Sequence, residues 1–504
     1  MARSSFHLQF LFCLFAGRFK AISTTSGDLR KSVALSCMFF SPLTPMAPPR
    51  PNIIVFFTDQ QRADTTGVHG NTSGLTPNFD RMAIEGTHVY NSFTCQPVCG
   101  PARSCLQTGM FANQTGVWRN GYRPHDHLKM LGTRFSEAGY DTGYIGKWHL
   151  MPHECQGPVP KDGRGGYEHW LAANLLEFVS GPYDTHFWDK DDNEVKLPGY
   201  RVDAQTDAAI RYIDDKAEAE NPFFLFLSYL EPHHQNHTDN YPAPDGYEAQ
   251  YAQSPLPPDL AQLGGTAPQH WPGYCGMIKR CDEALGRIMD SLKSLGIDDN
   301  TVVLFTSDHG CHFKTRNDEY KRSCHDASIR VPTAIRGPGF TGGGRLEQLC
   351  SLVDLPATLL DAGGIDVPEA FMGRSIKQLV SDRTMEWPDD VYVQISESHT
   401  GRCVRTSRYK YSVRCPALGE NGEPLDAPQA DEYVDDFLYD LEADPWELTN
   451  LIGMQSFKEV VADMRGRLVR RMQQCGETEP KFIDAPVAYA FQRQPEYHGG
   501  SLEQ

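Results

Sequence analysis

The sequence predicts an α/β fold, with helices on both sides of a large and mostly parallel sheet. Apolar runs typical of strands buried on both faces recur along the chain, and segments with helical spacing of apolar residues separate them. This alternation is typical of a parallel sheet covered by helices. The expected strands are 52–58, 140–146, 222–232 and 301–310, and the expected helices are 76–86, 277–296 and 351–364.

The first two elements illustrate these predictions. The run NIIVFFT (52–58) is continuously apolar, as a strand in the centre of a parallel sheet should be. The helix that follows has Thr76 as its expected N-cap and Pro77 in its first position, and it ends at Gly86. Both elements therefore have sequence signals for their beginning and end.

The last part of the chain has a different pattern, with short strands and turn-rich spacers. Its strands are expected at 390–397, 405–413 and 435–441, and a helix is expected over 457–473. This order predicts a smaller antiparallel sheet with a packed helix. We therefore expect an N-terminal extension over 1–45, a catalytic domain over 46–385 and a C-terminal subdomain over 386–504.

The N-terminal extension allows two cellular locations. The apolar run 6–17 follows Arg3, as in a signal peptide, but no clear cleavage site follows, and the run is too short to span a membrane. If residues 1–25 act as a signal peptide, the protein is exported or periplasmic. If Met46, directly ahead of the first strand, is the true start, it is cytoplasmic. The 14 cysteines fit either compartment.

The composition narrows the class of partner. With a net charge of −18, the chain is a poor partner for nucleic acids or anionic membranes, which need a basic surface. An anionic small molecule remains compatible, because a local basic pocket can form in an acidic protein. Segments 150–200 and 232–272 are rich in Pro, Gly, His and Tyr, and we expect them to form loops around a substrate site.

Reactive side chains follow four of the expected strands at their carboxyl ends, where ligands bind in open α/β sheets. These residues are Asp59 and Gln60, Lys147 and His149, His233 and His234, and Asp308 and His309. Any one of them alone would more often be a cap or a surface group. The oxygen donors among them suit Ca²⁺ or Mg²⁺ better than zinc. His309 is either a further ligand or a hydrogen-bond partner of a metal-bound group.

The basic residues near these strand ends indicate an anionic ester as the substrate. Lys147, Arg103 and Lys321 would bind its oxyanions, and a histidine such as His149 or His233 would protonate the leaving oxygen. A solvated surface charge is the simpler alternative for either lysine alone. Their occurrence within the strand-end motifs favours the functional interpretation.

The stretch CQPVCGPARSCLQTG (95–109) places Cys99 at the start of a probable helix and Arg103 one turn later. A buried structural thiol is the alternative interpretation. However, CGPAR matches the C-x-P-S/A-R signature of the type I, formylglycine-dependent sulfatases of the alkaline phosphatase-like superfamily, and SCLQTG continues that pattern. The resemblance implies that a formylglycine-generating or anaerobic sulfatase-maturing enzyme oxidises Cys99 to Cα-formylglycine. The hydrated aldehyde is then the nucleophile that attacks the sulfur of a sulfate ester.

The resemblance extends over about residues 51–475, through PNIIVFFTDQQR, GYIGKWHL, SYLEPHH, TSDHG, KRSCHDASIRVP and LYDLEADPWELTNL. It implies an alkaline phosphatase-like sandwich. The implied metal ligands are Asp59, Gln60, Cys99, Asp308 and His309, and the implied catalytic residues are Cys99, Arg103, Lys147, His149, His233 and Lys321. Gln60 departs from the acidic residue of many members, so the site carries one negative charge fewer. Ca²⁺ is favoured, with Mg²⁺ as the alternative.

The resemblance also implies the role of each catalytic residue. Arg103 and Lys147 stabilise the nucleophile, and Lys147 and Lys321 neutralise sulfate oxygens. His233 is the acid for the leaving alcohol, and His149 is the base that releases sulfate.

The substrate follows less directly. Polar residues beside the motifs favour a sulfated carbohydrate, although ordinary loop packing is the alternative for each of them. The candidates are His234, Arg119, Asn120 and His325, with His237 and Trp148 as further neighbours. Two rival functions remain: a phosphate or phosphonate monoester hydrolase of the same superfamily, and a non-catalytic homologue that binds sulfate esters.

Overall fold

The computed structural model describes residues 50–488, and the expectations for residues 1–45 and for Met46 lie outside this range. Ten strands form the large sheet: β1 (Asn52–Thr58), β2 (Thr87–Phe93), β3 (Asp141–Lys147), β4 (His169–Ala173), β5 (Thr185–Asp189), β6 (Glu194–Leu197), β7 (Phe223–Ser228), β8 (Thr301–Ser307), β9 (Ala334–Arg336) and β10 (Gly344–Ser351). Their order is β10-β2-β9-β8-β1-β7-β3-β4-β5-β6. Strands β8, β1, β7, β3 and β4 run parallel to one another. The expected α/β fold is confirmed.

Strand β1 lies at the centre of the sheet and is buried on both faces. Ile53, Val55 and Phe57 pack into one hydrophobic core, whereas Ile54 and Phe56 pack into the other. This is the consequence of alternating side chains in a run without polar residues.

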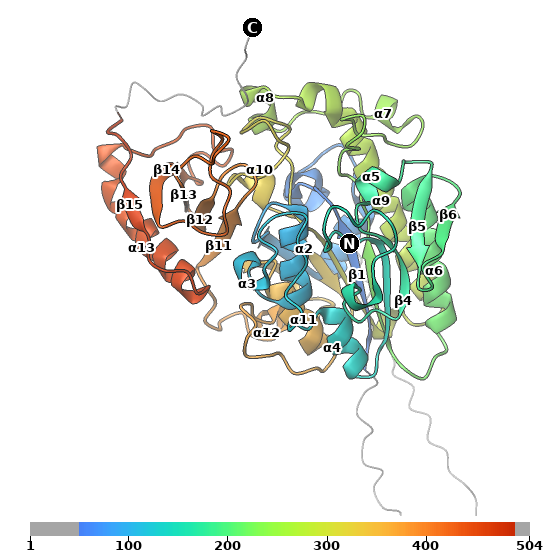
Figure 1. The fold of residues 1–504 in the computed structure, drawn as a ribbon. Coiled ribbons are helices and arrows are strands. Elements are labelled where there is room, and N and C mark those ends of the chain that lie inside the picture. Colours follow the sequence, from blue (N-terminus) through green and yellow to red (C-terminus); the bar gives the residue numbers. More distant parts are fainter. Residues whose placement is uncertain (1–49, 489–504) are drawn as a thin grey trace, which may run out of the picture. The chain divides into compact units, whose positions relative to one another are not determined.

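Helices cover both faces of the large sheet (Figure 1). Those that contribute buried residues to one core are α1 (Pro77–Glu85), α6 (Arg201–Lys216) and α9 (Ala267–Ser294). Those that contribute to the other are α2 (Cys99–Thr108), α4 (Leu131–Glu137) and α11 (Asp354–Ala362). Shorter helices are α3 (Ala112–Thr115), α5 (Leu176–Val179), α7 (Tyr247–Gln250), α8 (Pro258–Leu263), α10 (Asp326–Ile329) and α12 (Ile376–Ser381).

A second sheet of five strands forms the C-terminal part of the described chain. Its strands are β11 (Asp390–Ile395), β12 (Gly401–Thr406), β13 (Tyr409–Arg414), β14 (Glu432–Asp440) and β15 (Lys481–Ile483), and α13 (Lys458–Gln474) packs on it. The pairs are antiparallel except β14–β15, which is parallel. The opposite face packs against Phe93 and Ile329 of the catalytic part. The smaller sheet with its helix is as expected.

Three element predictions need correction. The single strand expected at 405–413 is a hairpin, because Thr406 and Tyr409 exchange hydrogen bonds that close a turn between β12 and β13. Helix α9 begins ten residues before the expected 277, at Ala267, and includes Pro272. Buried Trp271 and Tyr274 stabilise this first part by packing, which local propensity does not report. The segment 150–200, expected to form loops, contributes β4, β5 and β6.

Within residues 50–488, no helix combines the length and the apolar character that crossing a membrane requires.

Asp282 of α9 supports the start of α1, where its carboxylate accepts the backbone N–H groups of Asn78 (3.1 Å) and Phe79 (2.8 Å). Replacing Asp282 with alanine leaves the buried N–H of Phe79 and the half-buried N–H of Asn78 without this acceptor, so we expect the free energy of unfolding to fall by about 1–3 kcal/mol. Asp282→Asn keeps one acceptor oxygen, so its free energy of unfolding should fall by less. Urea unfolding measures both changes.

The same residue should make stability depend on pH. Burial raises the pKa of Asp282 to about 6, so folding favours its protonated form. This contribution is fully present below the unfolded-state pKa and is lost as the pH rises through the folded-state value. The advantage of the wild type over Asp282→Asn should therefore grow as the pH falls from about 7 to about 5. A difference that is constant with pH would contradict this assignment.

Candidate active site

The site forms at the carboxyl edge of four neighbouring parallel strands, β8, β1, β7 and β3. Asp59 follows β1, Asp308 follows β8, Lys147 ends β3, and His233 lies in the loop after β7. Because parallel strands end at the same edge, the residues that follow them meet in space. The structure thus brings together the strand-end residues that the sequence singled out.

Cys99 is the first residue of helix α2, and its sulfur lies among charged groups. The Sγ atom lies 2.9 Å from Nζ of Lys321, 3.3 Å from Nε2 of His309 and 3.6 Å from Oδ1 of Asp59. Burial raises the pKa of the thiol, but the positive charges of Lys147, Lys321 and His309 outweigh this effect and hold the pKa well below its usual value. An anionic group at this position is therefore stabilised.

The first turn of α2 is also tightly enclosed. The backbone N–H of Gly100 donates to Oδ1 of Asn120 at 2.8 Å. A Cβ atom at position 100 would lie 3.0 Å from that oxygen and 3.2 Å from the carbonyl oxygen of His149. Glycine therefore allows the helix start to approach the loop after β3.

Asp59 anchors two of the cations. Its Oδ2 accepts hydrogen bonds from Arg103 (2.8 Å) and Lys147 (2.8 Å), and all three side chains are buried. Arg103 also donates to the backbone carbonyl of Lys147 and to Oγ of Ser228. Burial raises the pKa of Asp59, but Lys147, His233 and Arg103 lower it more strongly. The pKa therefore lies well below its usual value, and Asp59 is ionised.

Four buried residues have the donor atoms for a divalent cation. One ligand atom each of Asp59, Cys99, Asp308 and His309 lies within 4.8 Å of all the others. Burial and the charge of Asp59 raise the pKa of Asp308 to about 7, so a bound cation would relieve an unfavourable pair of carboxylates. Carboxylate oxygens with one imidazole fit a divalent metal ion.

Gln60, the fifth expected ligand, makes different contacts. Its carboxamide donates to Sγ of Cys311 (3.3 Å) and lies 3.3 Å from Nδ1 of His234, while its backbone N–H donates to Oδ1 of Asp308 (3.0 Å). Its φ of +68° turns the chain so that this N–H faces the carboxylate. Gln60 therefore orients Asp308 through its backbone.

His233 and Lys321 form a pair beside Cys99. Nζ of Lys321 lies 3.1 Å from Nε2 of His233, and Nδ1 of His233 lies 2.6 Å from the carbonyl oxygen of His234. Because a carbonyl only accepts, Nδ1 carries a proton and Nε2 accepts from the lysine. Burial and the charge of Lys321 lower the pKa of His233. The ammonium of Lys321 therefore holds the imidazole of His233 beside Cys99.

Comparison with known proteins decides the family. The sulfatase family model matches residues 51–365, well over half of the chain. The chain belongs to the sulfatase family. A second model, the C-terminal region of N-sulphoglucosamine sulphohydrolase, matches residues 318–421. The resemblance found in the sequence motifs is thus confirmed.

Relatives of this sulfatase are similar over most of their length. An ulvan-active sulfatase of Formosa agariphila is 28% identical over 448 residues, which cover 85% of this chain and 82% of the relative. An N-acetylglucosamine-6-O-sulfatase of Bacteroides thetaiotaomicron is 24% identical, and the match covers 86% of this chain and 88% of the relative. One solved structure comes from Bacteroides thetaiotaomicron and is described in connection with glycosaminoglycan metabolism. It has a TM-score of 0.74 at 24% identity, and the match covers 85% of this chain and 97% of that structure's chain. The last comparison shows the shared fold.

Two residues of the sulfatase site were missed in the sequence. Oε1 of buried Glu177, in α5, lies 3.1 Å from Nζ of Lys147 and 3.4 Å from Nδ1 of His149. Ser228, which ends β7, binds Arg103. Ser228 could have been found as a strand-end residue, whereas Glu177 lies in a segment expected to be loop and carries no motif.

The expected substrate residues of the sulfatase occupy different environments. Asn120 contacts Gly100, and His234 contacts Gln60. Arg119 is 41% exposed and pairs with Asp426. His237 binds the backbone of Phe178 at the surface. Trp148 packs in the hydrophobic core with Tyr144 and Trp170, so it is a core residue rather than a substrate contact.

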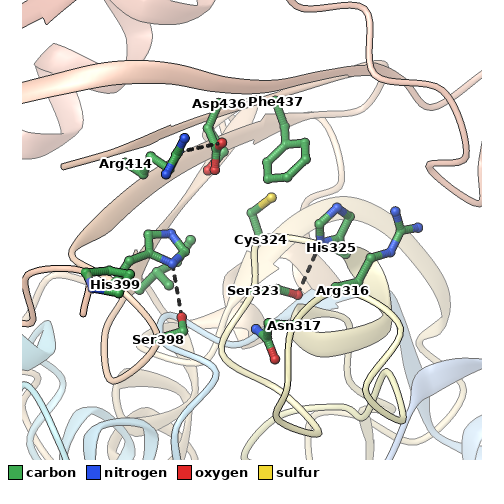
Figure 2. Close-up of a pocket in the computed structure, with 13 residues that line it drawn as sticks. Arg316, Asn317, Ser323, Cys324, His325, Ser398, His399, Arg414, Asp436 and Phe437 are labelled. Atoms are coloured by element: carbon green, nitrogen blue, oxygen red, sulfur yellow. Dashed lines mark hydrogen bonds and ion pairs between the residues drawn. The ribbon is translucent and has the colours of Figure 1, made fainter. Parts of the chain in front are cut away.

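His325 lies in a separate cavity of about 200 Å³ (Figure 2). Its ring binds Ser323 and Tyr439 and packs edge-on against Phe437 of β14. The structure therefore places His325 between the catalytic part and the C-terminal sheet.

Glu177→Gln should impair this sulfatase, because buried Lys147 and His149 then lose a neighbouring negative charge. We expect turnover of an aryl sulfate to fall about 10–100-fold. Steady-state kinetics measures the effect. Asp191→Asn, which changes an exposed carboxylate paired with Lys190, should leave the rate unchanged and serves as the control. Equal rates for the wild type and Glu177→Gln would show that Glu177 has no role in the reaction.

Proposed function

We propose that this sulfatase hydrolyses sulfate esters of a carbohydrate, with residue 99 as the nucleophile in its formylglycine form. The observation that carries the proposal is the position of Cys99 at the N-terminus of α2, with Lys321 at 2.9 Å and His309 at 3.3 Å. The helix N-terminus and the ammonium of Lys321 together favour a bound anion. In the formylglycine form, the aldehyde hydrate supplies an attacking oxygen and a route to expel sulfate from the same carbon.

The cations of the chain bind and orient the anionic ester. Lys321 and Lys147 neutralise sulfate oxygens, and Arg103 holds Asp59 in place beside residue 99. Preorganised charges of this kind in a water-excluded site contribute about 10²–10³-fold each to the rate.

Two histidines move protons. His233, whose Nε2 lies 3.1 Å from Nζ of Lys321, would be the acid that delivers a proton to the departing alcohol oxygen. Nδ1 of His149 lies 3.4 Å from Oε1 of Glu177, and His149 would be the base for sulfate release.

A divalent cation completes the site. Asp59, Asp308 and His309 would hold it together with residue 99, and Gln60 would orient Asp308. When bound, the cation would balance the two carboxylates and supply positive charge beside the anionic ester. We propose Ca²⁺ for this site because its donors are mainly carboxylate oxygens, with Mg²⁺ as the alternative.

The carbohydrate part of the proposal rests on exposed groups beside the helix start. Arg119 stacks on Trp118, and Trp118 packs against Tyr122, which is 43% exposed. Asn120, the next residue, contacts Gly100. Aromatic rings beside cationic and amide groups suit a sulfated sugar. Two relatives are named ulvan-active sulfatase and N-acetylglucosamine-6-O-sulfatase, and the second name, which contains a sugar, supports this class.

The first test concerns residue 99. Protein made in a host with a formylglycine-generating enzyme should yield a peptide whose mass and aldehyde reactivity match formylglycine. It should release sulfate from an aryl sulfate faster than phosphate from the matched aryl phosphate. Cys99→Ala should abolish turnover, whereas Cys105→Ala, in the same helix, should retain it. An unmodified thiol after expression in two hosts, or faster phosphate release, would refute the proposal.

The second test concerns the cation. Chelator-treated protein should gain thermal stability when Ca²⁺ or Mg²⁺ is added, because the ion binds only the folded state. We expect the larger increase in the melting temperature with Ca²⁺. Asp308→Asn should lose most of this increase, and Asp191→Asn should retain it. No cation-dependent shift in the wild type would contradict the assignment of the site.

A further inference from the structure

Glu397, in the loop between β11 and β12, binds the segment that carries Lys321. Its Oε2 lies 2.6 Å from a guanidinium nitrogen of Arg322, the residue after Lys321. The next residue of the loop, Ser398, donates from Oγ to the backbone carbonyl of Arg322 at 2.8 Å. One bond to the side chain and one to the backbone therefore connect Arg322 to the C-terminal part of the chain.

The same carboxylate reaches the start of helix α2 through Asn120. Oε1 of Glu397 accepts the backbone N–H of Asn120 at 2.6 Å, and Oε2 accepts its side-chain N–H at 3.3 Å. Oδ1 of Asn120 in turn accepts the N–H of Gly100 at 2.8 Å. The orientation of the Asn120 amide is thus fixed at both ends, and Glu397 is connected to the residue that follows the nucleophile.

Both ion-pair partners have unusual backbone conformations. Arg322 has a φ of +68° and Glu397 a φ of +64°, in the left-handed region that residues other than glycine rarely adopt. The backbone N–H of Glu397 donates to Asp426, which pairs with Arg119. Strained conformations of this kind persist only where surrounding contacts impose them, and they concentrate at functional sites.

The surroundings show why polar contacts hold the two segments. Asn317 and Ser323, from the segment of Lys321, and Ser398, from the loop of Glu397, line the same cavity (Figure 2). Because the cavity separates parts of the two segments, they cannot pack closely along their whole length. Within the segment itself, Nδ2 of Asn317 binds the carbonyl of Lys321 at 3.0 Å. The side chain of Glu397 is 7% exposed, so its ion pair is screened little by water.

We propose that Glu397 is a positioning residue for the sulfatase reaction. It sets the distance between Lys321 and residue 99 by binding Arg322 on one side and Asn120 on the other. This role rests on the function proposed above. It also makes the C-terminal sheet part of the catalytic machinery, although none of that sheet's strands contributes a residue to the cluster around Cys99 described here.

The experiment compares Glu397→Gln with a matched control. Asp435→Asn also removes a buried carboxylate that pairs with an arginine, Arg465 at 2.8 Å, but it lies within the C-terminal sheet and its helix. After formylglycine content is measured in each protein, we expect kcat of Glu397→Gln to fall about 10–100-fold and KM to change less than about threefold. Asp435→Asn should keep the wild-type kcat.

Two further measurements separate positioning from general stability. Arg322→Gln combined with Glu397→Gln should be no slower than Glu397→Gln alone, because Glu397→Gln already breaks the contact with Arg322. Hydrogen exchange should become faster at the start of α2 and around Lys321 in Glu397→Gln, but not in Asp435→Asn. This readout needs no catalysis.

Several outcomes would overturn the inference. They are a kcat of Glu397→Gln near the wild-type value, an equal loss in Asp435→Asn, and additive losses in the double variant. If the wild type itself released no sulfate, that result alone would refute the proposed function. Unchanged hydrogen exchange in Glu397→Gln would separately show that the carboxylate does not position these segments.

Discussion

The buried carboxylate of Asp59 is the interaction on which the site depends. A charge without exposure to water is tolerated only with close partners, and here Arg103 and Lys147 supply them at 2.8 Å each. The partners come from helix α2 and strand β3, whereas Asp59 follows β1. Pairing these charges therefore fixes the helix that carries Cys99 against the edge of the sheet.

The local charge of the site is opposite to that of the whole chain. The chain carries a net charge of −18, yet Lys321 contacts the sulfur of Cys99, and Lys147 and Arg103 bind the adjacent carboxylate of Asp59. The second carboxylate, Asp308, has no comparable surplus of positive charge, and its pKa is raised to about 7. An anionic substrate and a metal cation thus satisfy opposite halves of one buried cluster.

The C-terminal sheet contributes through hydrogen bonds and ion pairs at its border with the catalytic part. One of its faces packs against α13, and the other packs against Phe93 and Ile329. Glu397 lies in the connection between its first two strands and binds residues on both sides of the site. Since the family model for the C-terminal region begins at residue 318, it includes the segment of Lys321. That segment and the sheet form one structural unit around Glu397.

The sequence by itself determined the parallel sheet, the family and the strand-end residues Asp59, Lys147 and Asp308. Continuous apolar runs predict buried parallel strands, and parallel strands end at one edge of the sheet. The local sequence pattern was therefore sufficient to predict the sheet and the residues that meet at its edge. Only the tertiary structure decided that Glu177 lies beside Lys147, that Glu397 binds Arg322 and Asn120, and that Trp148 is a core residue. Their contacts connect segments far apart in the chain, and apolar periodicity reports the burial of a residue but not its distant polar partner.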